Sequence, residues 1–149
     1  MIEPNIHRAS GVATAVGVLS ALFAATFFFG ALLHLGVRVP LGFAVLAEPR
    51  ILPATIVESL CGLALAGAAF AVLTRSSWSW PAAFAAHTFA LGGVLLGTVA
   101  LVLGGGPNTD LNSIYHRVML VTLVAVLVLL LTPTGKAALL RRDRPSAQG

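Results

Sequence analysis

Charged residues are scarce in this sequence: Asp, Glu, Lys and Arg together make up 9% of its 149 residues. A soluble domain carries about 25% of such residues, because its surface must face water. Hydrophobic residues reach 58%, and the mean hydropathy is +0.96. A chain with so little polar surface is expected to have lipid as its solvent, which argues against a soluble enzyme or a soluble binding domain.

Cysteine is almost absent. Cys61 is the one cysteine in the sequence, so an intramolecular disulfide is impossible and there is no CxxC motif. This excludes the small four-helix membrane proteins that pass disulfides to quinones. Because Cys61 falls within an apolar segment, we expect a packing residue rather than a reactive thiol.

Four apolar windows are long enough to cross a hydrocarbon core of about 30 Å as helices, at a rise of about 1.5 Å per residue. They cover residues 11–36, 53–73, 82–103 and 111–131. Strands are disfavoured, since no alternating segments of barrel length are present. The first apolar run is also too long for the core of a cleavable signal peptide. We therefore predict an all-α fold, a single membrane domain over residues 1–149 built as an up-down four-helix bundle, with the bilayer as its main partner and a homo-oligomer as an option.

The basic residues are unevenly placed, and their placement predicts the orientation. With four spans, both termini share a side, and that side would carry six of the nine basic residues. The six are Arg8, Arg75, Lys136, Arg141, Arg142 and Arg144, against Arg38, Arg50 and Arg117 on the other side. The positive-inside rule then places both termini of a cell-membrane protein in the cytoplasm, with residues 133–149 as a basic tail. The net charge of +4 is explained in this way, and no nucleic-acid partner is predicted.

Residues at the helix ends support these boundaries. Asn108 or Thr109 is suited to cap the last span, and Pro133 to end it. Trp78 and Trp80 are expected in an aromatic belt at the cytoplasmic interface.

The connection "VRVPLGFAVLAEPRILP", residues 37–53, differs from the other two. Its three prolines exclude a single helix, yet it is too apolar for a solvated loop. We expect an interfacial or partly re-entrant segment over the outer mouth of the bundle. It would either rest on lipid head groups or act as a lid over a pocket.

Small residues form a stripe along the third span, comprising Ala86, Ala90, Gly93 and Gly97, with Ala82 at its start. Small residues let membrane helices approach closely, so we expect the second and third helices to pack tightly. No internal repeat relates the two halves, which leaves an inverted-repeat transporter without support.

Polar residues inside the spans are expected to have a structural or functional role, because a charged side chain at a helix centre costs about 2.5–3.5 kcal/mol on translocon scales. Five of them share a depth band near the outer side of the membrane. The five are His34, Glu58, Tyr115, His116 and Arg117. His87 enters from the inner side, about 15–20 Å from this band along the normal, and is expected to be hydrogen-bonded between helices.

Four interpretations of the outer cluster remain open. In the first, Arg117 pairs with Glu58, or each residue snorkels separately to the head groups. A pocket for a small molecule or lipid head group would use Glu58 and Arg117 as its polar wall. A metal would take His34, Glu58 and His116 as ligands, and haem would take His34 and His116 as axial ligands. A proton relay is the fourth interpretation.

The second span, within "VESLCGLALAGAAFAVLTR", resembles the DoxX-like group of small four-helix membrane proteins. In that group a glutamate opens the second helix, a Gly-Leu-rich run follows, and a basic residue closes it. The matching residues here are Glu58, Gly62, Leu63, Gly67 and Arg75. The group's glycine and lysine near the end of the first helix correspond to Gly30 and His34, so the lysine is missing. The resemblance covers about the first half of the chain, and implies a four-helix bundle with an accessory role beside membrane redox enzymes, but no catalytic residue.

Together these observations predict a small accessory or small-molecule- or lipid-binding protein with a polar pocket on the outer side. The alternative is a membrane redox enzyme, or a metal- or haem-binding one, that uses His34, Glu58 and His116. A small multidrug-type transporter is disfavoured, because the first span has no acidic residue. No cofactor is assigned.

Overall fold

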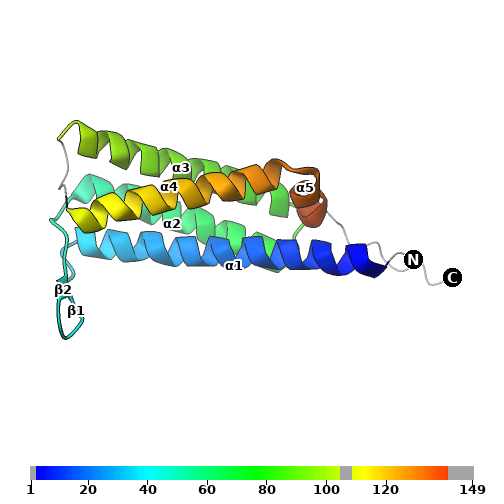
Figure 1. The fold of residues 1–149 in the computed structure, drawn as a ribbon, viewed down its shortest axis with the longest axis horizontal. Coiled ribbons are helices and arrows are strands. Elements are labelled where there is room, and N and C mark those ends of the chain that lie inside the picture. Colours follow the sequence, from blue (N-terminus) through cyan, green and yellow to red (C-terminus); the bar gives the residue numbers. More distant parts are fainter. Residues whose placement is uncertain (1–2, 105–108, 141–149) are drawn as a thin grey trace.

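Four long helices dominate the computed structural model, which describes residues 3–104 and 109–140, with side chains from Ser10 onward (Figure 1). The elements in chain order are α1 (Glu3–His34), β1 (Val39–Pro40), β2 (Val45–Leu46), α2 (Leu52–Leu73), α3 (Ser79–Val102), α4 (Asp110–Leu131) and α5 (Pro133–Leu140). Each of the four long helices contains a segment long and apolar enough to cross a membrane. The chain is therefore an all-α, multi-pass membrane protein, as its composition predicts.

The observed spans agree closely with the predicted windows. The largest difference at a span boundary is at α3, which begins at Ser79 rather than at residue 82. Helix α1 starts at Glu3, well before its membrane-spanning part begins at Ser10. Pro4 lies in the first turn of α1, where a proline costs a helix no hydrogen bond.

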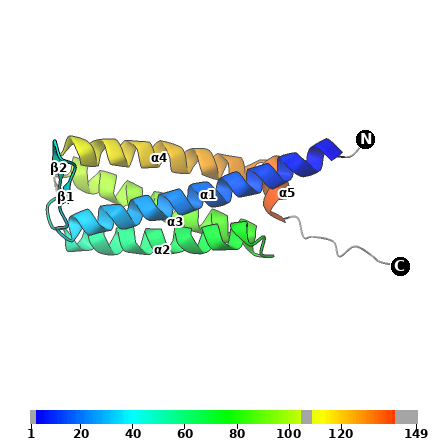
Figure 2. The same cartoon turned by 90° about the horizontal axis from the view of Figure 1, so that it is seen from below.

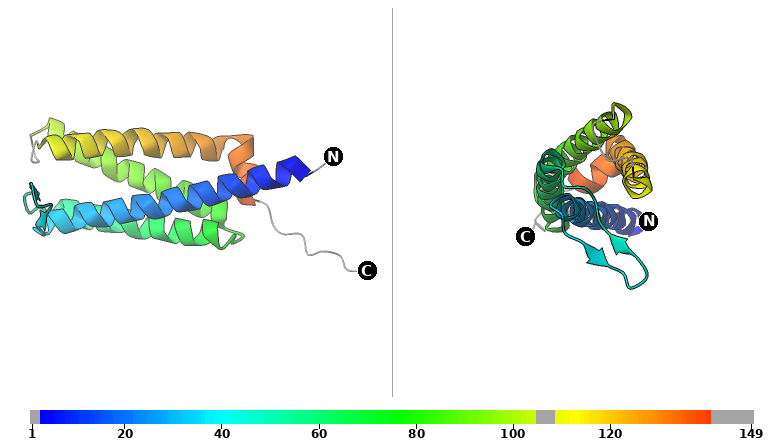
Figure 3. Two further views of the ribbon diagram at one scale, coloured as in Figure 1. Left: turned by 60° about the horizontal axis from the view of Figure 1, so that its bottom comes forward. Right: turned by 90° about the vertical axis from the view of Figure 1, so that its left-hand side faces the viewer.

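The helices run up and down and pack in chain order, α1 on α2, α2 on α3 and α3 on α4 (Figure 2). The start of α1 and helix α5 lie at one end of the bundle, and the β-strands lie at the other. We call these the inner and outer ends. Figure 3 shows the bundle along its length and from its outer end; helix α5 lies across the inner end of the bundle. Of the described helix pairs, α1 with α2 has the most extensive packing, whereas α1 and α4 make little direct backbone contact. The rings of Phe27 and Tyr115 meet edge to face between α1 and α4, with centroids 6.3 Å apart.

The small-residue stripe packs as predicted over most of its length. Ala86 and Ala90 are buried, and a Cβ added at Gly93 would fall 2.7 Å from Sγ of Cys61 on α2. The close approach of α2 and α3 is thus confirmed, and Cys61 is fully buried in it. Gly97, the last member, instead faces the His116 ring of α4. One stripe therefore serves two neighbouring helices.

The connection between α1 and α2 is a β-hairpin. Val39 pairs with Leu46 and Pro40 with Val45 in antiparallel register, and Leu41 N–H donates to the Ala44 carbonyl at 2.8 Å. The hairpin runs across the helix axes and extends beyond one side of the outer end (Figure 3). Phe43 at its tip is 91% exposed. The predicted absence of a helix is confirmed, but the strand pairing was not predicted.

Two expectations for the inner end are corrected or refined. Trp78 is exposed, as a belt residue should be. Trp80 instead packs inward: its Nε1–H donates to the Leu130 carbonyl at 3.0 Å, and Lys136 Nζ lies 5.6 Å from its ring centroid. Helix α4 ends at Leu131, just before Pro133 as predicted, but the first part of the predicted basic tail is a further helix, α5.

Other predictions concern residues at or beyond the described ranges. Thr109 caps α4 by accepting a hydrogen bond from the Asn112 N–H at 3.1 Å, which confirms that expectation. Asn108 lies outside the described residues. So do Arg141, Arg142, Arg144 and the side chain of Arg8, on which part of the orientation prediction depends.

Candidate functional site

Glu58 lies at the centre of the outer half of the bundle. Its side chain, from the second turn of α2, is turned toward α1, where Gly30 leaves room for it. A Cβ added at Gly30 would fall 2.8 Å from Oε1 of Glu58. The residue is only 8% exposed, and its Oε2 has no hydrogen-bond partner among the described residues. Gly30 therefore allows a carboxyl group to lie against the backbone of α1.

His34 reaches the same point from α1, because it lies one helical turn after Gly30 on the same face. Its Nε2 is 4.0 Å from Oε1 of Glu58, and its Nδ1 is 3.2 Å from the Pro49 carbonyl. A carbonyl oxygen can only accept, so Nδ1 carries the hydrogen and donates it. This leaves Nε2 facing the carboxyl group. The predicted proximity of His34 and Glu58 is confirmed.

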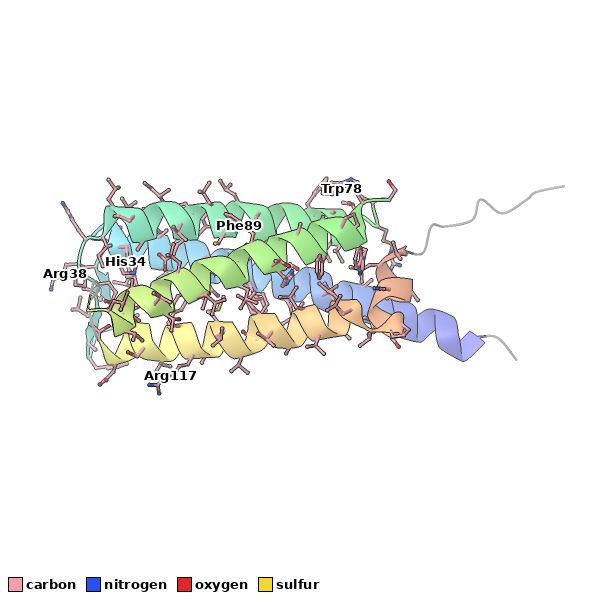
Figure 4. All side chains as sticks on the ribbon, turned by 90° about the horizontal axis from the view of Figure 1, so that it is seen from above. His34, Arg38, Trp78, Phe89 and Arg117 are labelled. Atoms are coloured by element: carbon pink, nitrogen blue, oxygen red, sulfur yellow. The ribbon has the colours of Figure 1, made fainter. Side chains whose placement is uncertain are left out.

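Two cavities adjoin Glu58. The first, which we call the α1–α4 cavity, has a volume of about 90 Å³ and lies between those helices and the return strand of the hairpin. The second, the α3 cavity, has a volume of about 220 Å³ and lies between α2, α3 and α4. His34, Glu58 and Asn112 line both. Figure 4 shows the side chain of His34 among the helices near the outer end.

Tyr115 of α4 completes the wall of the α1–α4 cavity. Its hydroxyl group is buried without a hydrogen-bond partner among the described residues. Its placement inside the predicted cluster agrees with the depth expected from the sequence.

The sequence reasoning missed two residues of the site. Asn112 is buried and lines both cavities. Glu48, from the chain after β2, lines the α1–α4 cavity; its Oε1 accepts from Thr109 Oγ1 at 2.9 Å, and its Oε2 is buried without a partner among the described residues. Both had a signal in the sequence. Asn112 lies one turn before His116, and Glu48 is the one acidic residue of a mostly apolar connection.

His116 shares a cavity with Glu58, whereas Arg117 does not. The His116 ring lines the α3 cavity beside Gly97, and its Nδ1 donates to the Asn112 carbonyl at 2.9 Å. Arg117 is exposed on the outside of α4 (Figure 4), and among the described residues it forms no ion pair with Glu58. The interpretation that Arg117 pairs with Glu58 is therefore wrong, and Arg117 shares no cavity wall with Glu58; instead it lines a separate cavity of about 230 Å³ together with His116.

The predicted metal-ligand set is not assembled. Within residues 3–104 and 109–140, no three His, Cys, Asp or Glu side chains are placed to hold one metal ion. His34, Glu58 and His116 all line the α3 cavity but do not converge as ligands of one ion.

His87 lies apart from the site and lines neither cavity. Its Nδ1 donates to the Ala83 carbonyl of its own helix at 2.7 Å. Its contact with α1 is aromatic instead, an edge arrangement with Phe23 at 5.9 Å between ring centroids. The expected hydrogen bond between helices is thus replaced by one within α3.

Comparison with known proteins assigns neither a family nor a function to the chain. No family model, no curated protein and no solved structure matches the chain. The resemblance of the second span to the DoxX-like group stays a hypothesis, and the function has to be argued from the geometry of the site.

Proposed function

We propose that this protein binds a small amphipathic molecule or lipid in the outer half of the membrane, with the polar group of the ligand at Glu58. The observation that carries the proposal is a carboxyl group that is buried, lacks a partner for Oε2 among the described residues and adjoins two cavities. In this proposal the termini are cytoplasmic, as the positive-inside rule predicts, so the site faces the outside.

The free-energy cost of burying polar atoms without hydrogen-bond partners supports the binding of a ligand. A buried polar atom without a hydrogen bond costs about 1–3 kcal/mol. Three such atoms belong to residues that line the α1–α4 cavity: Glu58 Oε2, Glu48 Oε2 and the Tyr115 hydroxyl. Space next to unsatisfied groups is the arrangement expected of a binding site, because the ligand supplies the missing partners.

The other interpretations have less support. A metal enzyme that uses His34, Glu58 and His116 would need these ligands to converge, and the described residues provide no such set of three. Haem ligation would need only His34 and His116 and is tested separately below. An accessory role beside another membrane protein, which the DoxX-like resemblance implies, is compatible with ligand binding. A bound ligand would then be what the protein presents to its partner.

Mass spectrometry of an organic extract from protein purified in mild detergent tests the proposal. Ala100 lines the α3 cavity, so Ala100→Phe should fill it and remove a copurifying molecule that the unsubstituted protein retains. Ala85→Phe makes the same change on an exposed face of α3 and should retain the molecule. Identical extracts from the three proteins would contradict the proposal. An absorption spectrum and metal analysis of the same samples test the redox alternative.

A further inference from the structure

We propose that the polar group of the ligand is a primary ammonium, held by the carboxylates of Glu58 and Glu48. This inference rests on the proposed binding function and specifies the chemistry of the ligand. It follows from an imbalance between hydrogen-bond acceptors and donors around the two cavities.

The carboxylates are the first source of acceptors. Glu58 and Glu48 both line the α1–α4 cavity, and each has an Oε2 without a partner among the described residues. An ionised carboxylate only accepts hydrogen bonds. A ligand that fills this cavity therefore meets two carboxylate oxygens that require a donor, together with the Tyr115 hydroxyl, which can either donate or accept.

The two histidines that line the α3 cavity provide further hydrogen-bond acceptors. The Nδ1–H groups of His34 and His116 are both used on backbone carbonyls, those of Pro49 and Asn112. In a neutral ring with the hydrogen on Nδ1, the remaining Nε2 is an acceptor. Both rings line the α3 cavity, so they offer the ligand acceptors rather than donors.

No described arginine or lysine balances the two carboxylates within the cavities, and His34, whose Nε2 lies 4.0 Å from Oε1 of Glu58, carries a charge only when its ring is protonated. Arg117 and Arg38 are exposed, and Arg50 lies against Gly36. None of these three arginines lines either cavity. With the His34 ring neutral, the positive charge has to come from the ligand.

A primary ammonium meets these requirements better than a neutral donor. It presents three N–H donors and a full charge in a compact group. The aromatic residues Phe29 and Tyr115 also line the α1–α4 cavity, and aromatic rings attract cations. A volume of about 90 Å³ compares with about 30 Å³ for one liquid water, so it suits a head group of a few heavy atoms. The larger α3 cavity has apolar walls, including Val57 and Leu96, that suit the start of an alkyl chain.

Binding of tritiated decylamine to the protein in maltoside detergent, read by scintillation proximity, tests the inference. We expect saturable binding that Glu58→Gln weakens about tenfold or more, because a charged hydrogen bond is lost. Asp110→Asn removes a carboxylate at the same end of the bundle but outside both cavities, and should leave the affinity unchanged. Glu48→Gln provides a second variant outside the long helices and should also weaken binding.

Competition separates this inference from the proposed function. If decan-1-ol or decanoate displaces the label as well as unlabelled decylamine does, the pocket binds amphiphiles but the ammonium assignment is wrong. If none of the three compounds binds saturably, both proposals fail. Nanodiscs identify the source of the ammonium. Displacement of the label by phosphatidylethanolamine, but not by phosphatidylcholine, which has no N–H donor, assigns a lipid head group; displacement by neither assigns a free amine.

Discussion

The contact between Gly30 and Glu58 determines where the carboxyl group of the site lies. Glu58 is placed by α2, but its side chain can turn toward α1 only because Gly30 has no Cβ. The site therefore depends on a residue that offers no chemistry of its own. This dependence can be tested without removing any polar group.

Gly30→Ala should weaken ligand binding with little loss of stability. The new Cβ would fall 2.8 Å from Oε1 of Glu58, and the end of a flexible side chain moves away more easily than backbone does. We expect decylamine affinity to fall severalfold while the free energy of unfolding changes by less than about 1 kcal/mol. Gly67→Ala is the matched control, since nothing lies within 4 Å of a Cβ added there. Equal affinities of the two variants would show that the carboxyl position is not critical.

Removal of two buried hydroxyl groups should change the free energy of unfolding in different ways. The Ser20 hydroxyl donates to the Val16 carbonyl at 2.8 Å, whereas the Tyr115 hydroxyl has no partner among the described residues. We expect Ser20→Ala to lower the free energy of unfolding by about 0.5–1.5 kcal/mol, and Tyr115→Phe to leave it unchanged or raise it. Unfolding of the ligand-free protein in mixed micelles measures both. A loss of stability on Tyr115→Phe would reveal a partner for the hydroxyl.

At the scale of residues, the sequence predicted the depth of the side chains in the membrane correctly. It did not predict the rotation of each helix about its own axis. Counting residues from the span ends brings His34 and Glu58 to one level, and the structure places them 4.0 Å apart. Arg117 shares that level but faces away from Glu58, because a hydropathy pattern fixes the rotation of a uniformly apolar helix poorly. After Arg117, Thr122 is the one polar residue of helix α4, so no polar face indicated its orientation.

At the scale of elements, the packing of α2 on α3 depends on Gly93. A Cβ there would fall 2.7 Å from Sγ of Cys61. Gly93→Ala should therefore cost about 1–3 kcal/mol of unfolding free energy, the usual range for overpacking. Adding Cys61→Ala to the same chain should restore part of the loss, because the two changes are made in contacting residues. Gly92→Ala, with nothing within 4 Å of its Cβ, is the control; a loss as large as that of Gly93→Ala would contradict the packing argument.

The hairpin is expected to lie in the lipid interface. It runs across the helix axes at the outer end, and its exposed residues include Leu41, Phe43 and Val45. In a Cys61→Ala background, a spin label on Phe43→Cys should be more accessible to oxygen than to a water-soluble nickel complex. The same label on Ser77→Cys, in the polar connection at the inner end, should show the reverse. A water-exposed signal at position 43 would place the hairpin outside the bilayer.

The elements themselves were predictable to different degrees. The spans follow from hydropathy alone, since lipid requires an uninterrupted apolar segment of known length. The hairpin did not follow, because its strands have two residues each and their apolar composition hides any alternation. Helix α5 was missed for a related reason: Pro133 suggested a stop, although a proline also suits the start of a new helix.

At the scale of the whole molecule, the orientation in the membrane can be tested directly. In a Cys61→Ala background, Ala47→Cys at the outer end should react with a membrane-impermeant maleimide on intact cells. Ser76→Cys, in the connection between α2 and α3, should react only after permeabilisation, because the basic residues favour the cytoplasm for that side. The reverse pattern would invert the topology and place the site on the cytoplasmic side.

The weak backbone contact between the described parts of α1 and α4 has a consequence for how binding must be measured. The rings of Phe27 and Tyr115 span this seam, and the α1–α4 cavity adjoins it. A ligand dissolved in the bilayer would enter sideways after rotation of side chains, which is fast compared with the separation of helices. Occupancy would then follow the mole fraction of the ligand in the surrounding lipid, and its concentration in water would matter only through partitioning. Two amphiphiles with equal intrinsic affinity but different chain lengths would therefore occupy the site very differently in a cell.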